Sequence, residues 1–216
     1  MPKVSRRSLL PLFGATFLAP SMLLTRNARA EEVIGQVERV QNFAAATIGA
    51  NDRILAVGDP IYLDDRVFTG ADARLELTFK DQTSLTLGAD AALDVDSFVF
   101  DGSGGEAGWN MLAGAFAMTT GLIGKNDPQS VVVTTPVSTI GIRGTTFWGG
   151  PVDSELYGVL ILDGAVDVKT PAGTVTLDEV GEGTKINMQT GVPSDPNTWG
   201  DGLVAQAMAS ITFVND

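Results

Sequence analysis

The run Thr134–Thr146 constrains the fold of this chain more than any other stretch. It alternates β-branched residues with small ones, and its two glycines lie on either side of a single arginine. Pro136 lacks a backbone donor and favours an extended Thr135, while Gly141 and Gly144 permit positive φ or close backbone approach. The run therefore predicts short strands that meet at a tight corner.

The rest of the chain shows the same alternation of short apolar runs with turn residues. In Ala73–Phe79 the apolar side chains occupy every second position, which predicts a strand with one buried and one solvated face. Asp163-Gly164 lies between two apolar runs, Leu156–Leu162 and Ala165–Lys169, and this dipeptide suits a type I′ hairpin turn. Strands in the second half recur about every ten residues, which suits stacked rungs. We therefore predict an all-β fold, a solenoid-like or roll-like stack of short strands.

Further strands are expected along the chain, at Val33–Val40, Arg66–Thr69, Ser84–Leu87, Ala92–Val95, Gly108–Thr119, Val131–Thr134, Ser138–Ile142, Thr145–Trp148, Val175–Leu177 and Lys185–Met188. Only the C-terminal segment Asn197–Ile211 has helical spacing, with Asp201 as an expected cap and apolar residues on one face. We expect this short amphipathic helix to dock on the β core; a helix that binds a partner or a membrane surface is the alternative. Residues 191–216 thus form a linker and this helix.

The first thirty residues have the pattern of a cleavable export signal. Basic residues precede the apolar stretch Leu9–Leu24, and Ala28-Arg29-Ala30 is an A-x-A cleavage site. Arg6-Arg7 resembles a twin-arginine signal, and an ordinary secretory signal is the alternative. We expect residues 1–30 to be removed on export, which leaves a β domain over residues 31–190 and no later segment apolar enough to span a membrane.

Composition excludes several classes of function. The chain has 14 Lys+Arg and 26 Asp+Glu, and loss of residues 1–30, which hold five of the basic residues and none of the acidic ones, leaves a formal charge of −17. Nucleic acid is therefore not an expected partner, because it needs clustered basic residues. The absence of His and Cys excludes Ser-His-Asp and Cys-His catalysis and imidazole zinc sites. We expect no cofactor.

Several motifs occur in an order and spacing that resemble those of the FecR domain, the periplasmic sensing module of bacterial cell-surface signalling. They lie between about Gly35 and Lys185, at Gly58-Asp59, Val67–Gly70, Ala73–Phe79, Asp81 with Thr83, Leu85–Gly88, Trp109–Thr119 and Val131–Thr146. The resemblance implies an all-β periplasmic domain with a non-enzymatic sensing role. Family members of the signalling type relay the occupancy of an outer-membrane receptor to a sigma factor.

The N-terminal region departs from that pattern. Signalling members carry a cytoplasmic anti-sigma segment and a membrane span before this domain, whereas here a cleavable signal stands in their place. We therefore expect a periplasmic adaptor that binds a periplasmic or envelope protein, of undetermined oligomeric state. An envelope module that binds glycan or peptidoglycan in a groove lined by Trp148, Tyr157 and acidic side chains is the alternative. A hydrolase based on paired carboxylates is a third, weaker hypothesis.

Four residues are candidates for binding. Arg143 can present a bidentate fork to a carboxylate, although an internal salt bridge that pins the corner also explains it. Phe147, Trp148 and Tyr157 offer aromatic area beside the loop Gly149-Gly150-Pro151, with core packing as the alternative. No metal ligands are expected. Asp94, Asp96 and Asp101 lie close in sequence, but their spacing fits no calcium loop, and a solvated strand face is the simpler explanation.

Overall fold

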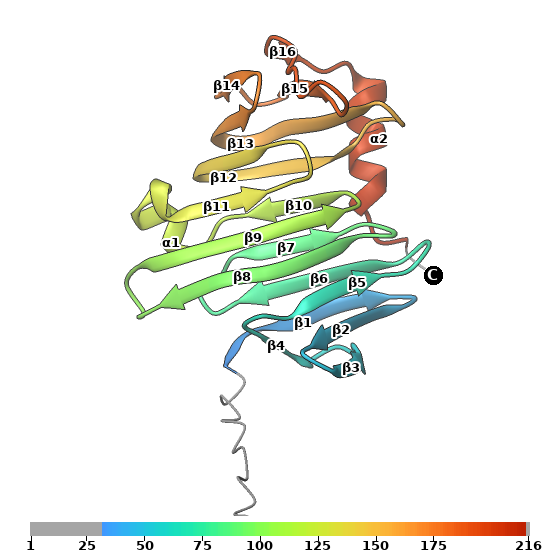
Figure 1. Ribbon diagram of the computed structural model, residues 1–216, viewed down its shortest axis with the longest axis vertical. Coiled ribbons are helices and arrows are strands. Elements are labelled where there is room, and N and C mark those ends of the chain that lie inside the picture. The colour runs from blue at the N-terminus through green and yellow to red at the C-terminus, as the bar shows by residue number, and fades with distance from the viewer. Residues whose placement is uncertain (1–31, 215–216) are drawn as a thin grey trace, which may run out of the picture. The chain divides into compact units, whose positions relative to one another are not determined.

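The structure is a computed structural model that describes residues 32–214, which belong to the second of two units in the chain, residues 31–216. The export signal expected at residues 1–30 lies outside the described residues. Sixteen strands joined in one sheet dominate the described part, and Figure 1 shows them as a ladder. The expected all-β fold with a short C-terminal helix is confirmed.

In chain order the strands are β1 (Val33–Gln41), β2 (Ala44–Ile48), β3 (Asn51–Ile54), β4 (Pro60–Tyr62), β5 (Arg66–Thr69), β6 (Arg74–Phe79), β7 (Ser84–Leu87), β8 (Ala92–Phe100), β9 (Gly105–Ala113), β10 (Phe116–Thr119), β11 (Val131–Thr134), β12 (Thr139–Pro151), β13 (Leu156–Thr170), β14 (Gly173–Leu177), β15 (Glu182–Asn187) and β16 (Asn197–Thr198). The helices are α1 (Leu122–Asn126), the 3₁₀ turn η1 (Pro128–Ser130) and α2 (Asp201–Ile211).

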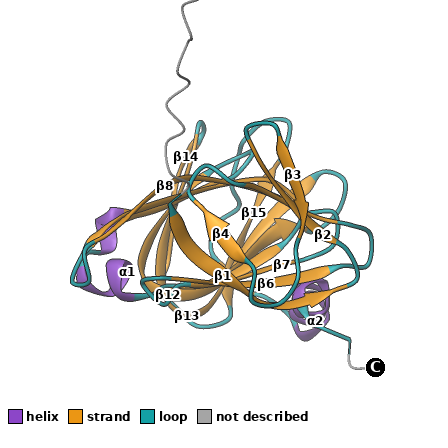
Figure 2. Ribbon diagram, turned by 90° about the horizontal axis from the view of Figure 1, so that it is seen from below, coloured by secondary structure: helices purple, strands orange, loops and turns teal. Residues whose placement is uncertain are grey.

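The sheet is curled into two layers that face each other. One, here the open layer, runs β3-β2-β5-β8-β9-β11, and the other, the helix-covered layer, runs β4-β1-β6-β7-β10. Both layers pair with β12, which in turn pairs with β13. Figure 2 shows the layers from below, with β8 on one side and β1, β6 and α2 on the other.

Strands β12 and β13 belong to both layers because they bend together at two facing glycines. The first half of β12 pairs with β11 and its second half with β10, while the two halves of β13 pair with β15 and β14. Gly144 has φ +61° and Gly164 has φ +77°, and the pairing shifts register between Arg143 and Thr146. A Cβ on Gly164 would lie 2.5 Å from the Gly144 carbonyl oxygen, so the bend requires glycine there.

This bend corrects the hairpin expected at Asp163-Gly164. β13 continues through both residues, and the positive φ of Gly164 forms a bulge instead of a two-residue turn. The reversal lies before β13, where Asp153 Oδ1 accepts hydrogen bonds of 2.8 Å from the backbone N–H groups of Glu155 and Leu156. The strand expected over Gly108–Thr119 is likewise two strands in different layers, because Gly114 turns the chain with φ +81°.

A single apolar core fills the space between the layers. The inward residues of β6 and β7 are buried in the alternating pattern expected from the sequence. Phe79, Phe98 and Trp109 form an aromatic cluster within it, with ring centroids 5.4–6.4 Å apart. The two layers are thus held together by burial of apolar area rather than by cross-links, since the chain has no cysteine.

Helix α2 packs on the outer face of the helix-covered layer, which confirms docking on the β core. Ala207 and the apolar face of the helix contact a small cluster that includes Trp148, Leu160 and Trp199. The Trp148 Nε1–H donates to Ser210 Oγ at 3.0 Å. The cap expected at Asp201 is wrong by one position, because Gly200 is the N-cap and Asp201 begins the helix. Among residues 32–214 no helix has the length and apolar character needed to cross a bilayer.

Candidate functional site

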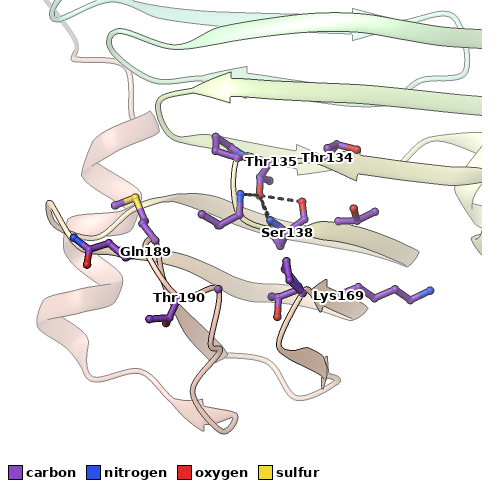
Figure 3. A pocket seen from close by; sticks show the side chains of 13 residues that line it. Thr134, Thr135, Ser138, Lys169, Gln189 and Thr190 are labelled. Atoms are coloured by element: carbon purple, nitrogen blue, oxygen red, sulfur yellow. Dashed lines mark hydrogen bonds between the residues drawn. The ribbon is translucent and has the colours of Figure 1, made fainter.

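A groove runs over the outer face of β11, β12 and β13 and continues to the ends of these strands, where the loop after β15 lies across from the β11–β12 turn. Two adjoining pockets of about 660 and 750 Å³ make up this groove, and both are lined by Thr139 and Lys169. Figure 3 shows the first pocket, with Thr134, Thr135 and Ser138 at the β11–β12 turn and Gln189 and Thr190 across from them. We call the combined feature the threonine groove.

A row of polar side chains crosses this face at right angles to the strands. Asn110 pairs with Thr134, Thr134 with Thr139, Thr139 with Lys169, and Lys169 with Thr174. Residues paired directly across neighbouring strands point to the same face of the sheet. Amide, hydroxyl and ammonium groups therefore form one continuous row across these strands. The next row has Val132 and Gly141 as neighbours, and the missing side chain at Gly141 deepens the groove there.

The β11–β12 turn is held by its own side chains. Thr135 Oγ1 accepts a hydrogen bond of 3.0 Å from the Ser138 N–H, and the two hydroxyl groups are 2.9 Å apart. The Thr135 N–H donates to the Ser138 carbonyl at 2.8 Å, and Pro136 occupies the position where a turn favours fixed φ. Both Thr135 and Ser138 are buried, so these two residues serve the turn and leave the surface to Thr134 and Thr139.

Arg143 lies in the second pocket, as part of an ion pair. Its Nη2 is 2.6 Å from Asp167 Oδ2, and its side chain keeps 58% of its surface exposed. Among the described residues this is the guanidinium's single hydrogen bond, which leaves Nε and Nη1 without a hydrogen-bond partner there. The Thr176 hydroxyl donates to Asp167 at 2.7 Å and, together with the Arg143 guanidinium, lowers the pKa of that carboxyl below its ordinary value. The salt bridge foreseen as one explanation of Arg143 therefore exists, on an exposed face.

Lys169 and Asp167 belong to the site and were missed as site residues from the sequence. Lys169 is exposed and lines both pockets, and its side chain makes no hydrogen bond or salt bridge with any residue between 32 and 214. The signal was present, because Asp167 and Lys169 alternate with the apolar Val166 and Val168 and must share the outer face. What the sequence did not show was which strands lie beside them.

The other three candidate residues are buried and not exposed at a surface. Phe147 is fully buried in the core, and Trp148 lies under α2. Tyr157 is also buried, and burial raises the pKa of its hydroxyl. These placements match the core-packing alternative, and a groove lined by Trp148 and Tyr157, as expected for a glycan site, does not form at the surface.

Each of the three aspartates considered as calcium ligands has a different environment. Asp94 is paired with Arg66, with Oδ1 2.5 Å from Nε, while Asp101 accepts backbone hydrogen bonds from Ser103 and Gly104 in its own turn. Desolvation and the nearby Asp94 raise the pKa of Asp96. Residues 32–214 contain no group of three or more His, Cys, Asp or Glu side chains arranged to hold a metal ion.

Fold and site together define a class: a two-layered β module that presents a polar groove on the uncovered face of a curled sheet. The model of the family described as FecR protein matches residues 65–176, just over half of the chain. The chain belongs to the FecR protein family, and its resemblance to that family is confirmed. This places it among signalling and sensing modules.

Two crystal structures of a proposed anti-sigma factor from Parabacteroides distasonis share the fold. Each has a TM-score of 0.54 and 17% sequence identity to this chain, and the alignment covers 65% of this chain and 62% of that protein. The chain thus aligns with less than two thirds of the length of those proteins. Among curated proteins, none matches it.

Proposed function

We propose that this chain is an exported, non-enzymatic sensing or adaptor module that binds a protein partner in the periplasm through the threonine groove. One observation carries the proposal. Two of the few basic residues of a strongly acidic chain, Arg143 and Lys169, stand together in a groove on the layer face that α2 does not cover. Asp127 and Asp167 line the same pocket, but exposed cations are uncommon on so acidic a chain, and these two offer donors to an anionic group of a partner.

The arrangement suits a carboxylate from an acidic side chain or a chain terminus. Asp167 holds the Arg143 guanidinium by one nitrogen, which orients the planar fork and leaves its other N–H donors for a second acceptor. Lys169 adds a mobile point charge beside it, and Thr139 supplies a hydroxyl between the two pockets. A peptide laid along the polar row can satisfy its backbone groups with Asn110 and the exposed threonines.

The role in the envelope follows from the family and the N-terminal sequence. We propose that residues 1–30 direct export by the twin-arginine route, that residues 31–190 form the FecR-like domain, and that residues 191–216 are the linker and helix. A sensing module of the FecR protein family that is exported in this way would act through a protein that it binds.

Affinity capture from a periplasmic extract tests the proposal. We expect the wild-type chain to recover one defined protein, the double variant Arg143→Ala/Lys169→Ala to lose it, and the control Lys80→Ala, an exposed lysine outside the groove, to keep it. Equal recovery by the wild type and the double variant would remove the groove from the mechanism. Retention on purified cell-wall material without any protein partner would favour the glycan alternative instead.

A further inference from the structure

A second surface lies at the other end of the open layer, where apolar side chains form an exposed row. Ile54 of β3 pairs with Ala45 of β2, Ala45 pairs with Phe68 of β5, and Phe68 pairs with Ala92 of β8. Because direct cross-strand partners share a face, these four residues point outward together. We call them the apolar row.

The apolar row is open to solvent. Ile54 is 73% exposed and Phe68 36%. Phe43, which immediately precedes β2 and lies two residues before Ala45, is 51% exposed. A shallow pocket of about 350 Å³ lies between Phe43, Ala45 and Ile54. Leu112, at a bulge of β9 beside Ala92, is also exposed and extends the apolar area to a fifth strand. Large apolar side chains gathered in one exposed patch mark an interaction site more often than single ones do.

Carboxylates border this patch on two sides. The adjacent cross-strand row contains Asp52 and Asp94. Asp72 and Asp90 lie in turns next to Phe43. One of these turns is joined to Phe43 by a hydrogen bond of 2.9 Å from the Gly70 N–H to the Phe43 carbonyl. Arg66 is paired with Asp94 in the same row and offsets only that charge. The rim is thus acidic, and its complement is a group of Lys or Arg side chains around an apolar centre.

Geometry favours an extended polypeptide as the occupant. Neighbouring strands lie about 4.8 Å apart, so the row from Ile54 to Ala92 spans roughly 14 Å. In an extended segment, side chains at i, i+2 and i+4 point the same way and span about 13 Å. A second copy of this chain is disfavoured because both copies carry a large negative charge. An anionic membrane surface is disfavoured by the same acidic rim.

We infer that the apolar row docks an extended polypeptide segment with alternating apolar side chains and flanking Lys or Arg. This surface is separate from the threonine groove, so the inference goes beyond the proposed function.

The probe is a capped seven-residue peptide in which Lys alternates with Leu. The controls are the same peptide with Glu in place of Lys and with Ser in place of Leu. Binding to the purified chain is followed by fluorescence anisotropy at low and high salt.

We expect the Lys-Leu peptide to bind, the two control peptides to fail, and the affinity to fall with salt because part of the attraction is between exposed charges. The double variant Ile54→Ser/Phe68→Ser should weaken binding about tenfold or more. The matched control Val99→Ser, another exposed apolar residue of β8, should not, and neither should Arg143→Ala/Lys169→Ala. Failure of the threonine groove in periplasmic capture would leave these peptide results unaffected, so the two proposals fail separately.

Several results would overturn the inference. The inference is wrong if Ile54→Ser/Phe68→Ser binds the peptide as tightly as the wild type and circular dichroism shows that this variant is folded. Phe43→Ser gives a second test of the same patch. Binding of the Glu peptide as tightly as the Lys peptide would contradict the role of the acidic rim. Sedimentation that shows a dimer dissociated by Phe68→Ser, or binding to anionic vesicles that the same variant abolishes, would assign the patch to a different occupant.

Discussion

Gly164→Ala tests the bend that brings the threonine groove together. Gly164 has φ +77°, and its added Cβ would lie 2.5 Å from the Gly144 carbonyl oxygen and 2.9 Å from Thr145 Cα. The left-handed conformation costs an alanine about 1–2 kcal/mol, partly offset by a stiffer unfolded chain. Contact with backbone atoms, which cannot rotate away, adds about 1–3 kcal/mol. We expect the free energy of unfolding to fall by about 2–4 kcal/mol in total.

Gly49→Ala is the matched control for this substitution. Gly49 has φ +60°, and nothing lies within 4 Å of an added Cβ, so only the conformational cost of about 1 kcal/mol applies. Urea unfolding of both variants measures the difference, and each kcal/mol should lower Tm by about 2–4 °C for a chain of this size. If both variants lose the same free energy of unfolding, the argument that a Cβ at position 164 clashes with the facing backbone is refuted.

Three further outcomes follow from the structure. Asp167→Asn should lower the free energy of unfolding at pH 7, because the pKa of Asp167 is lower in the folded chain than in the unfolded one. The stability that the ionised carboxylate contributes is complete above the unfolded pKa of about 4 and is lost as pH falls through the folded pKa. The difference in stability between the variant and the wild type should therefore disappear in unfolding curves measured at acid pH. Trp148→Ala should lower the free energy of unfolding by about 3–5 kcal/mol and speed amide exchange in α2, whereas Trp148→Phe should cost much less. Arg143→Ala should shift Tm by only a few degrees, since an exposed ion pair contributes about 0.2–1 kcal/mol; a large loss would make the residue structural.

The sequence predicted the strand content well and the connections between strands poorly. Alternation in Ala73–Phe79 gave the right strand and the right buried face, because a period of two depends on local geometry alone. Gly164 shows where that reasoning ends. An Asp-Gly pair allows positive φ, and only the neighbouring strands decide whether the chain turns back or bulges onward. β2 was missed because Ala44-Ala45-Ala46 has weak strand propensity, and its pairing with β5 supplies the stability that the sequence does not show.

The candidate site was predicted in the same uneven way. Arg143 was found because a lone arginine between glycines is unusual, and its placement in the groove follows from the exposed side of β12. Phe147 and Trp148 looked like interface residues because exposure is not encoded in residue type; the register of β12 and the position of α2 determine that both are covered. Lys169 became visible only when β13 was known to lie beside β12.

The most direct test of the central claim is site-specific photo-crosslinking in the periplasm. A photoreactive residue at Thr139, which lies between the two pockets of the threonine groove, is compared with one at Ala205, an exposed position on α2. We predict that Thr139 captures one defined protein, that Arg143→Ala/Lys169→Ala abolishes the adduct, and that Ala205 captures nothing comparable. An adduct at Ala205 but not at Thr139 would contradict the claim that the uncovered face of the open layer is where the partner binds.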